Sequence, residues 1–323
     1  MRFAFLSSSL FKNNTSYPYL SHTIAFTNVA VIGAGSGVGK ALVEELLSSS
    51  EPIFQITVLA RESSNYINPS SRVNVIKHDL TDRRGMVEHL RGIDAVILTQ
   101  GVDSSFVATS TAIIEAAIDA GVKMVMPSDL GGKDTPIFIQ ATAHKVPVRA
   151  FLAEKVNEGK ITHTTIKNGA FFSMPLKLGY GIDYEAKKAT LFDEGTQKFH
   201  TTTSSTIAYA IGNVLRSPAQ FSNKTLYIHD FYTTQSEMIS IIEAIVGESF
   251  NKTTLDLAEV GKQSMEGLKR GERTPQNISG TLRYAVWGEE GSSDWDNDDD
   301  SDALGLPKKD LRDELKKKME QGM

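Results

Sequence analysis

The chain has 323 residues, 40% of them apolar, which suffices for one large α/β domain or two modest ones. Its net charge of −5 gives no basic surface, so nucleic acid and anionic lipid are disfavoured as partners. The absence of cysteine excludes a disulfide framework, a thiolate nucleophile and a cysteine-ligated metal site. No apolar run approaches the roughly 18 residues of a membrane-spanning helix, so we expect no membrane insertion.

Residues 1–27 form the first region of the chain. They are rich in Ser, Thr and Asn and contain Arg2 and Lys12 but no acidic residue, a composition that weakly resembles a mitochondrial transit peptide. Because arginine is scarce, we favour a disordered arm or a misplaced start codon, and a cytoplasmic protein.

Residues 28–170 alternate short β-branched apolar runs with helical patterns, which is typical of a parallel sheet covered by helices. The expected strands are residues 28–32, 55–60, 73–77, 95–99, 123–127 and 161–166. Helices are expected at residues 40–48, with Leu42 and Leu46 facing the sheet, and at 108–120, ending before Gly121. We therefore predict a Rossmann-type, doubly wound α/β domain.

Residues 171–323 are expected to form a smaller α/β subdomain on the substrate side. After a loop through Lys177, Gly179 and Gly181, the pattern favours strands near Thr190 and at residues 225–229 and 253–257. It favours helices at residues 205–215, 236–246 and 309–319, and one further helix that includes Val260. The acidic stretch at 288–302 lacks the spaced glycine and terminal glutamate of a calcium loop, so we expect a solvated loop.

A glycine-rich turn follows the first expected strand and opens a helix, as in dinucleotide-binding folds. One glycine permits the tight turn, another lets backbone amides approach a diphosphate, and the last lets the helix pack close to the strand. The expected cofactor contacts in this turn are Gly33, Gly35, Ser36, Gly37, Val38 and Gly39.

The end of the second strand indicates which dinucleotide is bound. NAD-binding folds place a carboxylate there, whereas this strand ends in Arg61, which suits the 2′-phosphate of NADP(H). Glu62 follows, so an ordinary surface ion pair is the alternative. Asp79 is expected on the adenine side or as a helix cap, and Gln100 and Gly101 are expected to border the cofactor.

The reacting residues do not follow the usual short-chain dehydrogenase pattern, Tyr-x-x-x-Lys after the fifth strand. That spelling occurs only from Tyr184 to Lys188, beyond the sixth strand, and residues 128–149 contain no tyrosine. We therefore treat Tyr184 as unrelated to catalysis. The histidines form no metal-spaced pair, so we expect no metal site.

Three segments carry a family resemblance: MPSDLGG at 126–132, KVPVR at 145–149 and ITHTTIKNGAF at 161–171. With them, the chain from about Val29 to Gly247 resembles the NmrA-like and isoflavone reductase-like branch of the atypical short-chain dehydrogenases, which includes many fungal oxidoreductases. The resemblance implies that Lys145 lies beside the nicotinamide and handles the substrate proton, with Asn168 and Phe171 nearby. One departure is Ser36, which replaces the middle glycine of the family's usual turn.

Two functions remain open. The first is an NADPH-dependent reductase of secondary metabolism that acts on an aromatic or polyketide-like carbonyl or enone. Lys145 would act as the acid, because burial lowers the pKa of a lysine. The second is an NADP-sensing regulator, although regulators of this family tend to lose the lysine. A solvent-facing Lys145 is the structural alternative, since lysines are seldom buried. A homodimer is left open.

Overall fold

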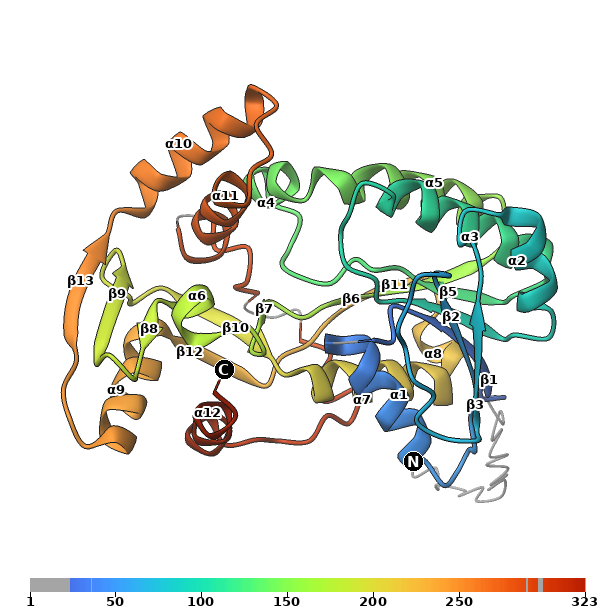
Figure 1. Ribbon diagram of the computed structural model, residues 1–323, viewed down its shortest axis with the longest axis horizontal. Helices are drawn as coiled ribbons and strands as arrows, with labels where there is room; N and C mark the ends of the chain where they lie inside the picture. Colours follow the sequence, from blue (N-terminus) through green and yellow to red (C-terminus); the bar gives the residue numbers. More distant parts are fainter. Residues whose placement is uncertain (1–23, 36, 289, 296–298, 323) are drawn as a thin grey trace, which may run out of the picture.

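The computed structural model describes residues 24–35, 37–288, 290–295 and 299–322. Its centre is a seven-stranded parallel sheet with the strand order β11-β6-β5-β4-β1-β2-β3 (Figure 1). The strands are β1 (Asn28–Ile32), β2 (Gln55–Ala60), β3 (Val73–Lys77), β4 (Ala95–Leu98), β5 (Met124–Met126), β6 (Thr162–Lys167) and β11 (Lys224–Tyr227). Six of them match the expected strands to within one residue at each end.

Helices cover both faces of this sheet because its strands are apolar on both sides. One face is covered by α1 (Gly37–Ser48), α7 (Ser204–Arg216) and α8 (Pro218–Phe221). The other is covered by α2 (Arg83–Leu90), α3 (Phe106–Asp119) and α5 (Val146–Asn157) (Figure 1). Leu42 and Leu46 of α1 are fully buried, as the helical pattern predicts.

The chain leaves the large sheet after β6 and later returns to it. Helix α7 packs against α1, and β11 pairs in parallel with β6, from Lys224 opposite Thr164 to Tyr227 opposite Lys167. From the sequence pattern, these residues are expected in the smaller subdomain. In the structure, β11 is the edge strand of the large sheet, where it pairs with β6, and α7 packs on one face of that sheet.

The second region contains two three-stranded sheets, in the orders β12-β10-β7 and β13-β9-β8. Their strands are β7 (Ala170–Phe171), β8 (Ile182–Asp183), β9 (Lys188–Phe192), β10 (Lys198–Thr202), β12 (Phe231–Thr234) and β13 (Asn251–Leu255). The helices there are α6 (Leu176–Tyr180), α9 (Gln235–Val246), α10 (Leu257–Lys269), α11 (Pro275–Trp287) and α12 (Leu311–Glu320). Helix α4 (Pro136–Ala141) and the 3₁₀ turn η1 (Ala143–Lys145) lead from β5 into α5.

Two helices of the second region were not anticipated. The expected loop through Lys177 and Gly179 is the short helix α6, which ends where Gly181 adopts a left-handed conformation (φ 69°). Helix α11 begins at Thr274, whose side chain caps the Asn277 amide, and it packs between α10 and α4. The position of α11 therefore depends on these tertiary contacts.

The expectation of a solvated acidic loop is wrong for residues 290–295. Trp295 is 2% exposed, and Ser292 and Ser293 are fully buried. The Ser292 carbonyl accepts a hydrogen bond from the Lys133 amide at 2.6 Å. This hydrogen bond joins the segment to the turn after β5, and the Trp295 ring stacks on His200 of β10, with centroids 4.5 Å apart. Residues 296–298 lie outside the described residues.

The N-terminal arm was expected to extend to residue 27. Residues 1–23 lie outside the described residues, whereas Phe26 and Thr27 already join the fold. The Phe26 amide donates to the Leu215 carbonyl at 2.8 Å, and the Thr27 amide donates to the Asp94 carboxylate at 3.1 Å. Within the described chain, no helix combines the length and the apolarity that spanning a bilayer requires.

Candidate active site

A polar cleft lies at the carboxyl ends of β1, β2 and β4. It has a volume of about 620 Å³, and Gly33, Ala34 and Gly35 form its floor after β1. Gly33 (φ 89°) and Gly37 (φ 55°) both adopt left-handed conformations, which fold the chain sharply from strand into helix. This is the edge of a parallel sheet at which ligands bind.

The glycines of the turn differ in what surrounds them. A Cβ on Gly33 would lie 2.5 Å from the Gln100 amide nitrogen, and one on Gly39 would clash with the Gly33 carbonyl oxygen. A Cβ on Gly35 would meet nothing within 4 Å. Gly33 and Gly39 thus permit close packing, whereas Gly35 leaves open space above the backbone for a ligand.

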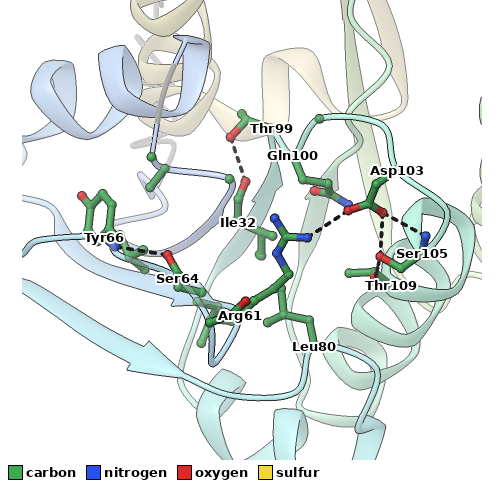
Figure 2. Close-up of a pocket in the computed structure, with 18 of the residues that line it drawn as sticks. Ile32, Arg61, Ser64, Tyr66, Leu80, Thr99, Gln100, Asp103, Ser105 and Thr109 are labelled. Atoms are coloured by element: carbon green, nitrogen blue, oxygen red, sulfur yellow. Dashed lines mark hydrogen bonds and ion pairs between the residues drawn. The ribbon is translucent and has the colours of Figure 1, made fainter.

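Arg61 and Asp103 face each other across this cleft (Figure 2). Arg61 Nη1 lies 2.9 Å from Asp103 Oδ2, and the Arg61 side chain is 67% exposed. Asp103 is held by Ser105, whose amide and hydroxyl both donate to Oδ1. The partner of Arg61 is therefore Asp103 and not the neighbouring Glu62. A ligand phosphate at this position would compete with Asp103 for the guanidinium.

A second, largely apolar cavity of about 800 Å³ adjoins the cleft, since Val102 and Asp103 line both. Its walls come from segments far apart in the sequence, including β7, α4, α6 and α11. Besides Val102, the larger apolar lining residues are Leu130, Phe138, Phe171, Met174, Leu178, Ile278, Leu282, Val286 and Trp287. Such a lining suits an apolar ligand.

Lys145 lines this cavity at the junction of η1 and α5. Its side chain is only 12% exposed, and its Nζ donates a hydrogen bond to the Leu130 carbonyl at 2.5 Å. Burial, with the nearby charges of Lys167 and Arg149, lowers the Lys145 pKa to about 8, although Asp129 opposes this effect. The solvent-facing alternative for Lys145 is therefore wrong.

The sequence profile of the NmrA-like family matches residues 26–290. The chain belongs to the NmrA-like family. Relatives of this NmrA-like protein include the oxidoreductase aprR of Aspergillus flavus, which is 28% identical over 75% of this chain and 82% of the relative. The isoflavone reductase homolog P3 of Arabidopsis thaliana is 26% identical over 81% of this chain and 86% of the relative. The resemblance stated from three sequence segments is confirmed.

Solved structures share the fold of this NmrA-like protein. An isoflavone reductase superposes with a TM-score of 0.72 at 18% identity, over 90% of this chain and 99% of that chain. AtPrR2, solved with NADP+ and (+)pinoresinol, superposes with a TM-score of 0.70 at 17% identity, over 90% and 98%. Together with the seven-stranded sheet, these likenesses confirm the predicted Rossmann-type fold.

The structure brings several expected site residues to the two cavities. Gly33, Gly35, Arg61, Gln100 and Gly101 line the cleft of this NmrA-like protein. Lys145 and Phe171 line the apolar cavity. Gly37 begins α1 directly behind the turn, and Ser36 lies outside the described residues.

Four other residues that were expected to contact the cofactor line neither cavity as described, namely Val38, Gly39, Asp79 and Asn168. Val38 and Gly39 are buried in the first turn of α1. Asn168 is fully buried and accepts a hydrogen bond from the Gly131 amide at 2.8 Å. It therefore supports the Gly131–Gly132 wall from behind.

The Asp79 carboxylate is hydrogen-bonded within its own turn. Its carboxylate accepts hydrogen bonds from the Thr81 amide at 2.9 Å and the Thr81 hydroxyl at 2.7 Å. The helix-cap alternative is wrong, because Asp82 caps α2, and Leu80 is the residue of this segment that lines the cleft. A contact from Asp79 to adenine stays a prediction.

Sequence reasoning missed Asp103, Asp129 and Lys167 as site residues. Asp103 approaches Arg61 from 42 positions along the chain. The only early signal for Asp129 and Lys167 was their place at the carboxyl ends of two adjacent strands. Tyr184 donates to the Met319 carbonyl at 3.2 Å, which agrees with its treatment as unrelated to catalysis. Among the described residues, no three potential metal ligands cluster.

Proposed function

We propose that this protein is an NADP(H)-dependent oxidoreductase that reduces a carbonyl or enone of a small apolar, aromatic or polyketide-like molecule. The observation that carries the proposal is the buried amine of Lys145, set in an apolar cavity that shares Val102 and Asp103 with the glycine-turn cleft. Relatives named as oxidoreductases and reductases support it. A role in secondary metabolism stays a prediction.

The residues of the cleft fit a dinucleotide. The open space at Gly35 and the start of α1 would receive the diphosphate, because backbone amides at a helix N-terminus favour anions. Arg61 would take the 2′-phosphate in place of Asp103, and Gln100 and Gly101 would border the remainder. Fold neighbours solved with NADPH or NADP+ support this choice of cofactor. When bound, NADPH supplies the hydride.

Lys145 supplies the proton. When the carbonyl carbon of the substrate gains the hydride, the carbonyl oxygen takes a proton from the Lys145 ammonium. Lys145 becomes a neutral amine and then regains a proton from solvent. A pKa of about 8 keeps Lys145 mostly protonated at neutral pH while making its proton easier to release than that of an ordinary lysine. A substrate that fills the apolar cavity would displace water from around Lys145 and so strengthen this interaction.

His144, beside Lys145, does not compete for this role. Burial and the positive charges of Lys145 and Arg273 lower the pKa of His144 to about 4. It is therefore neutral at physiological pH. Its ring packs edge-on against Phe106, with centroids 5.3 Å apart. His144 forms part of the wall of the apolar cavity.

A screen of NADPH oxidation against aromatic ketones and enones tests the proposal, run beside separate titrations with NADP+ and NADPH. We expect turnover of at least one apolar carbonyl compound and tighter binding of NADPH than of NADH. Turnover with none of these compounds, together with unequal affinity for NADP+ and NADPH, would contradict the enzyme and favour the redox sensor.

A further inference from the structure

A buried ionic cluster lies behind Lys145. Asp129 follows β5 and accepts two hydrogen bonds from Arg149, one from Nε at 2.8 Å and one from Nη2 at 2.5 Å. Lys167, at the end of β6, contributes a third from Nζ at 3.1 Å. Both oxygens of the Asp129 carboxylate are therefore engaged from α5 and β6.

Lys167 is the most deeply buried cation of the cluster. It is 3% exposed and also lies 3.2 Å from Asp134, which Arg149 approaches at 2.9 Å. Asp134 is 45% exposed and is therefore partly solvated. Burying an ammonium in this way requires compensating partners, and the two carboxylates provide them.

Lys145 is the third cation near Asp129, but it stays outside this pairing. Its Nζ lies 3.9 Å from Asp129 Oδ1 and donates to the Leu130 carbonyl instead. Asp129, Asp134, Arg149 and Lys167 line a separate cavity of about 270 Å³, whereas Lys145 lines the apolar one. Asp129 thus stands between Lys167 and Lys145.

We propose that Lys167 is a positioning residue for Lys145: with Arg149, it holds the Asp129 carboxylate beyond hydrogen-bond distance from the Lys145 amine. This inference rests on the proposed function, in which Lys145 gives up a proton. A direct ion pair with Asp129 would stabilise the ammonium form of Lys145 and hinder that release.

The charges that surround Lys145 agree with this arrangement. Burial is the main cause of its lowered pKa, and Lys167 and Arg149 lower it further. Asp129 and Asp134 act in the opposite direction. Neutral His144 adds no charge beside Lys145, and Arg273 approaches the same wall from the loop before α11. The Lys145 pKa therefore depends on whether the Asp129 carboxylate pairs with Lys167 or with Lys145.

Competitive labelling with acetic anhydride, followed by peptide mass spectrometry, measures Lys145 protonation in the cofactor-free protein. In the wild type, we expect half-maximal reactivity at about pH 8. In Lys167→Met, Asp129 loses a partner and Lys145 loses a repelling charge. Both changes raise the pKa, so the midpoint should move upward by about one pH unit or more. Lys167→Arg keeps the charge and should stay near the wild-type midpoint.

Lys123→Met is the matched control. It removes one positive charge beside β5, but its partner is Asp94, at 2.8 Å, so the Lys145 midpoint should not change. If Lys167→Met does not fold, Lys167→Gln takes its place, because its amide retains a donor for Asp129. An unchanged midpoint in a folded neutral variant, or an equal shift in Lys167→Arg, would overturn the inference.

The labelling result is independent of turnover, so two failures can be told apart. If the midpoint shifts but no substrate is reduced, the positioning of Lys145 stands and the proposed function fails. If the wild type reduces a substrate and Lys167→Met keeps the wild-type midpoint, the inference alone fails. With an active wild type, the alkaline limb of its pH profile should move by the same amount in Lys167→Met.

Discussion

The cleft at the glycine turn and the adjoining apolar cavity differ in how they are lined. The cleft is lined by the glycine turn and by a mixture of polar and apolar side chains, among them Arg61, Gln100 and Leu80, at the ends of three neighbouring strands. The apolar cavity is lined mainly by apolar side chains from several distant segments, with the buried amine of Lys145 among them. The two share only Val102 and Asp103 among their described lining residues.

This difference assigns separate tasks to the two cavities. Backbone amides and an arginine bind anions over a solvated edge, where a single contact contributes modestly. An ammonium in an apolar cavity has a shifted pKa and strong interactions, which suits chemistry on a neutral substrate. Substitutions in the cleft should therefore change cofactor affinity, and substitutions at Lys145 should change turnover.

The largest expected effect is at Lys145. Lys145→Met retains the apolar stem but removes the proton donor, so turnover should fall by about 10³-fold or more while the NADPH dissociation constant stays within about twofold. Stopped-flow NADPH oxidation and a fluorescence titration measure the two quantities. Lys160→Met, at an exposed lysine paired with Glu158, is the control. If Lys145→Met lost NADPH binding and turnover together, the assignment of separate tasks to the two cavities would be wrong.

The second effect is at Gly35 and concerns binding. Gly35→Asp should fold, because a Cβ there meets nothing within 4 Å, but it places a carboxylate where the diphosphate is expected. We expect NADPH affinity to fall by about tenfold or more, measured by isothermal titration. Gly35→Ala, which adds no charge, should change it by less than about threefold. Equal effects of Ala and Asp would point to sterics alone.

The third effect is on cofactor preference. Arg61→Ala should reduce the preference for NADPH over NADH by about 10- to 100-fold, since a charge-assisted contact to the 2′-phosphate is lost. Asp103→Asn frees the guanidinium and should shift the preference slightly the other way. The ratio of kcat/KM values for the two cofactors reports both. An unchanged ratio in Arg61→Ala would exclude a 2′-phosphate contact.

The smallest effect is on the pH profile. Lys145 must be protonated to donate, and its lowered pKa is about 8, so kcat should be level below this pH and fall above it. Steady-state rates between pH 6 and 10, with cofactor stability controlled separately, check the sign. A rate that rises through pH 8 would make the neutral amine, acting as a base, the reactive form.

The cleft could be predicted largely from the sequence because its parts are local. Strand, glycine turn and helix follow one another from residue 28 to 48, and parallel strands bring Arg61 and Gln100 to the same edge. The Arg61–Asp103 pair could not be predicted, because only the folded loop after β4 brings Asp103 to Arg61.

The apolar cavity was far less predictable. The family resemblance identified Lys145. The helices α6 and α11, which form part of the cavity wall, were not predicted, because the sequence pattern in these segments is weak. Trp295 lies in a stretch whose acidic composition favours solvent exposure. Burial of its ring nevertheless stabilises the fold more than solvation of this segment would. The partners of Lys167 likewise depend on the packing of α5 against β6.

A crystal structure of the NADP+ complex tests the central claim most directly, that both cavities form one active site, joined at Val102 and Asp103, with Lys145 in the apolar cavity. The account predicts the diphosphate on Gly33–Gly35, the 2′-phosphate on Arg61, and the nicotinamide beside Val102 with the Lys145 amine within about 4 Å of the space over its ring. A nicotinamide turned away from the apolar cavity, with Lys145 unchanged and distant, would contradict it.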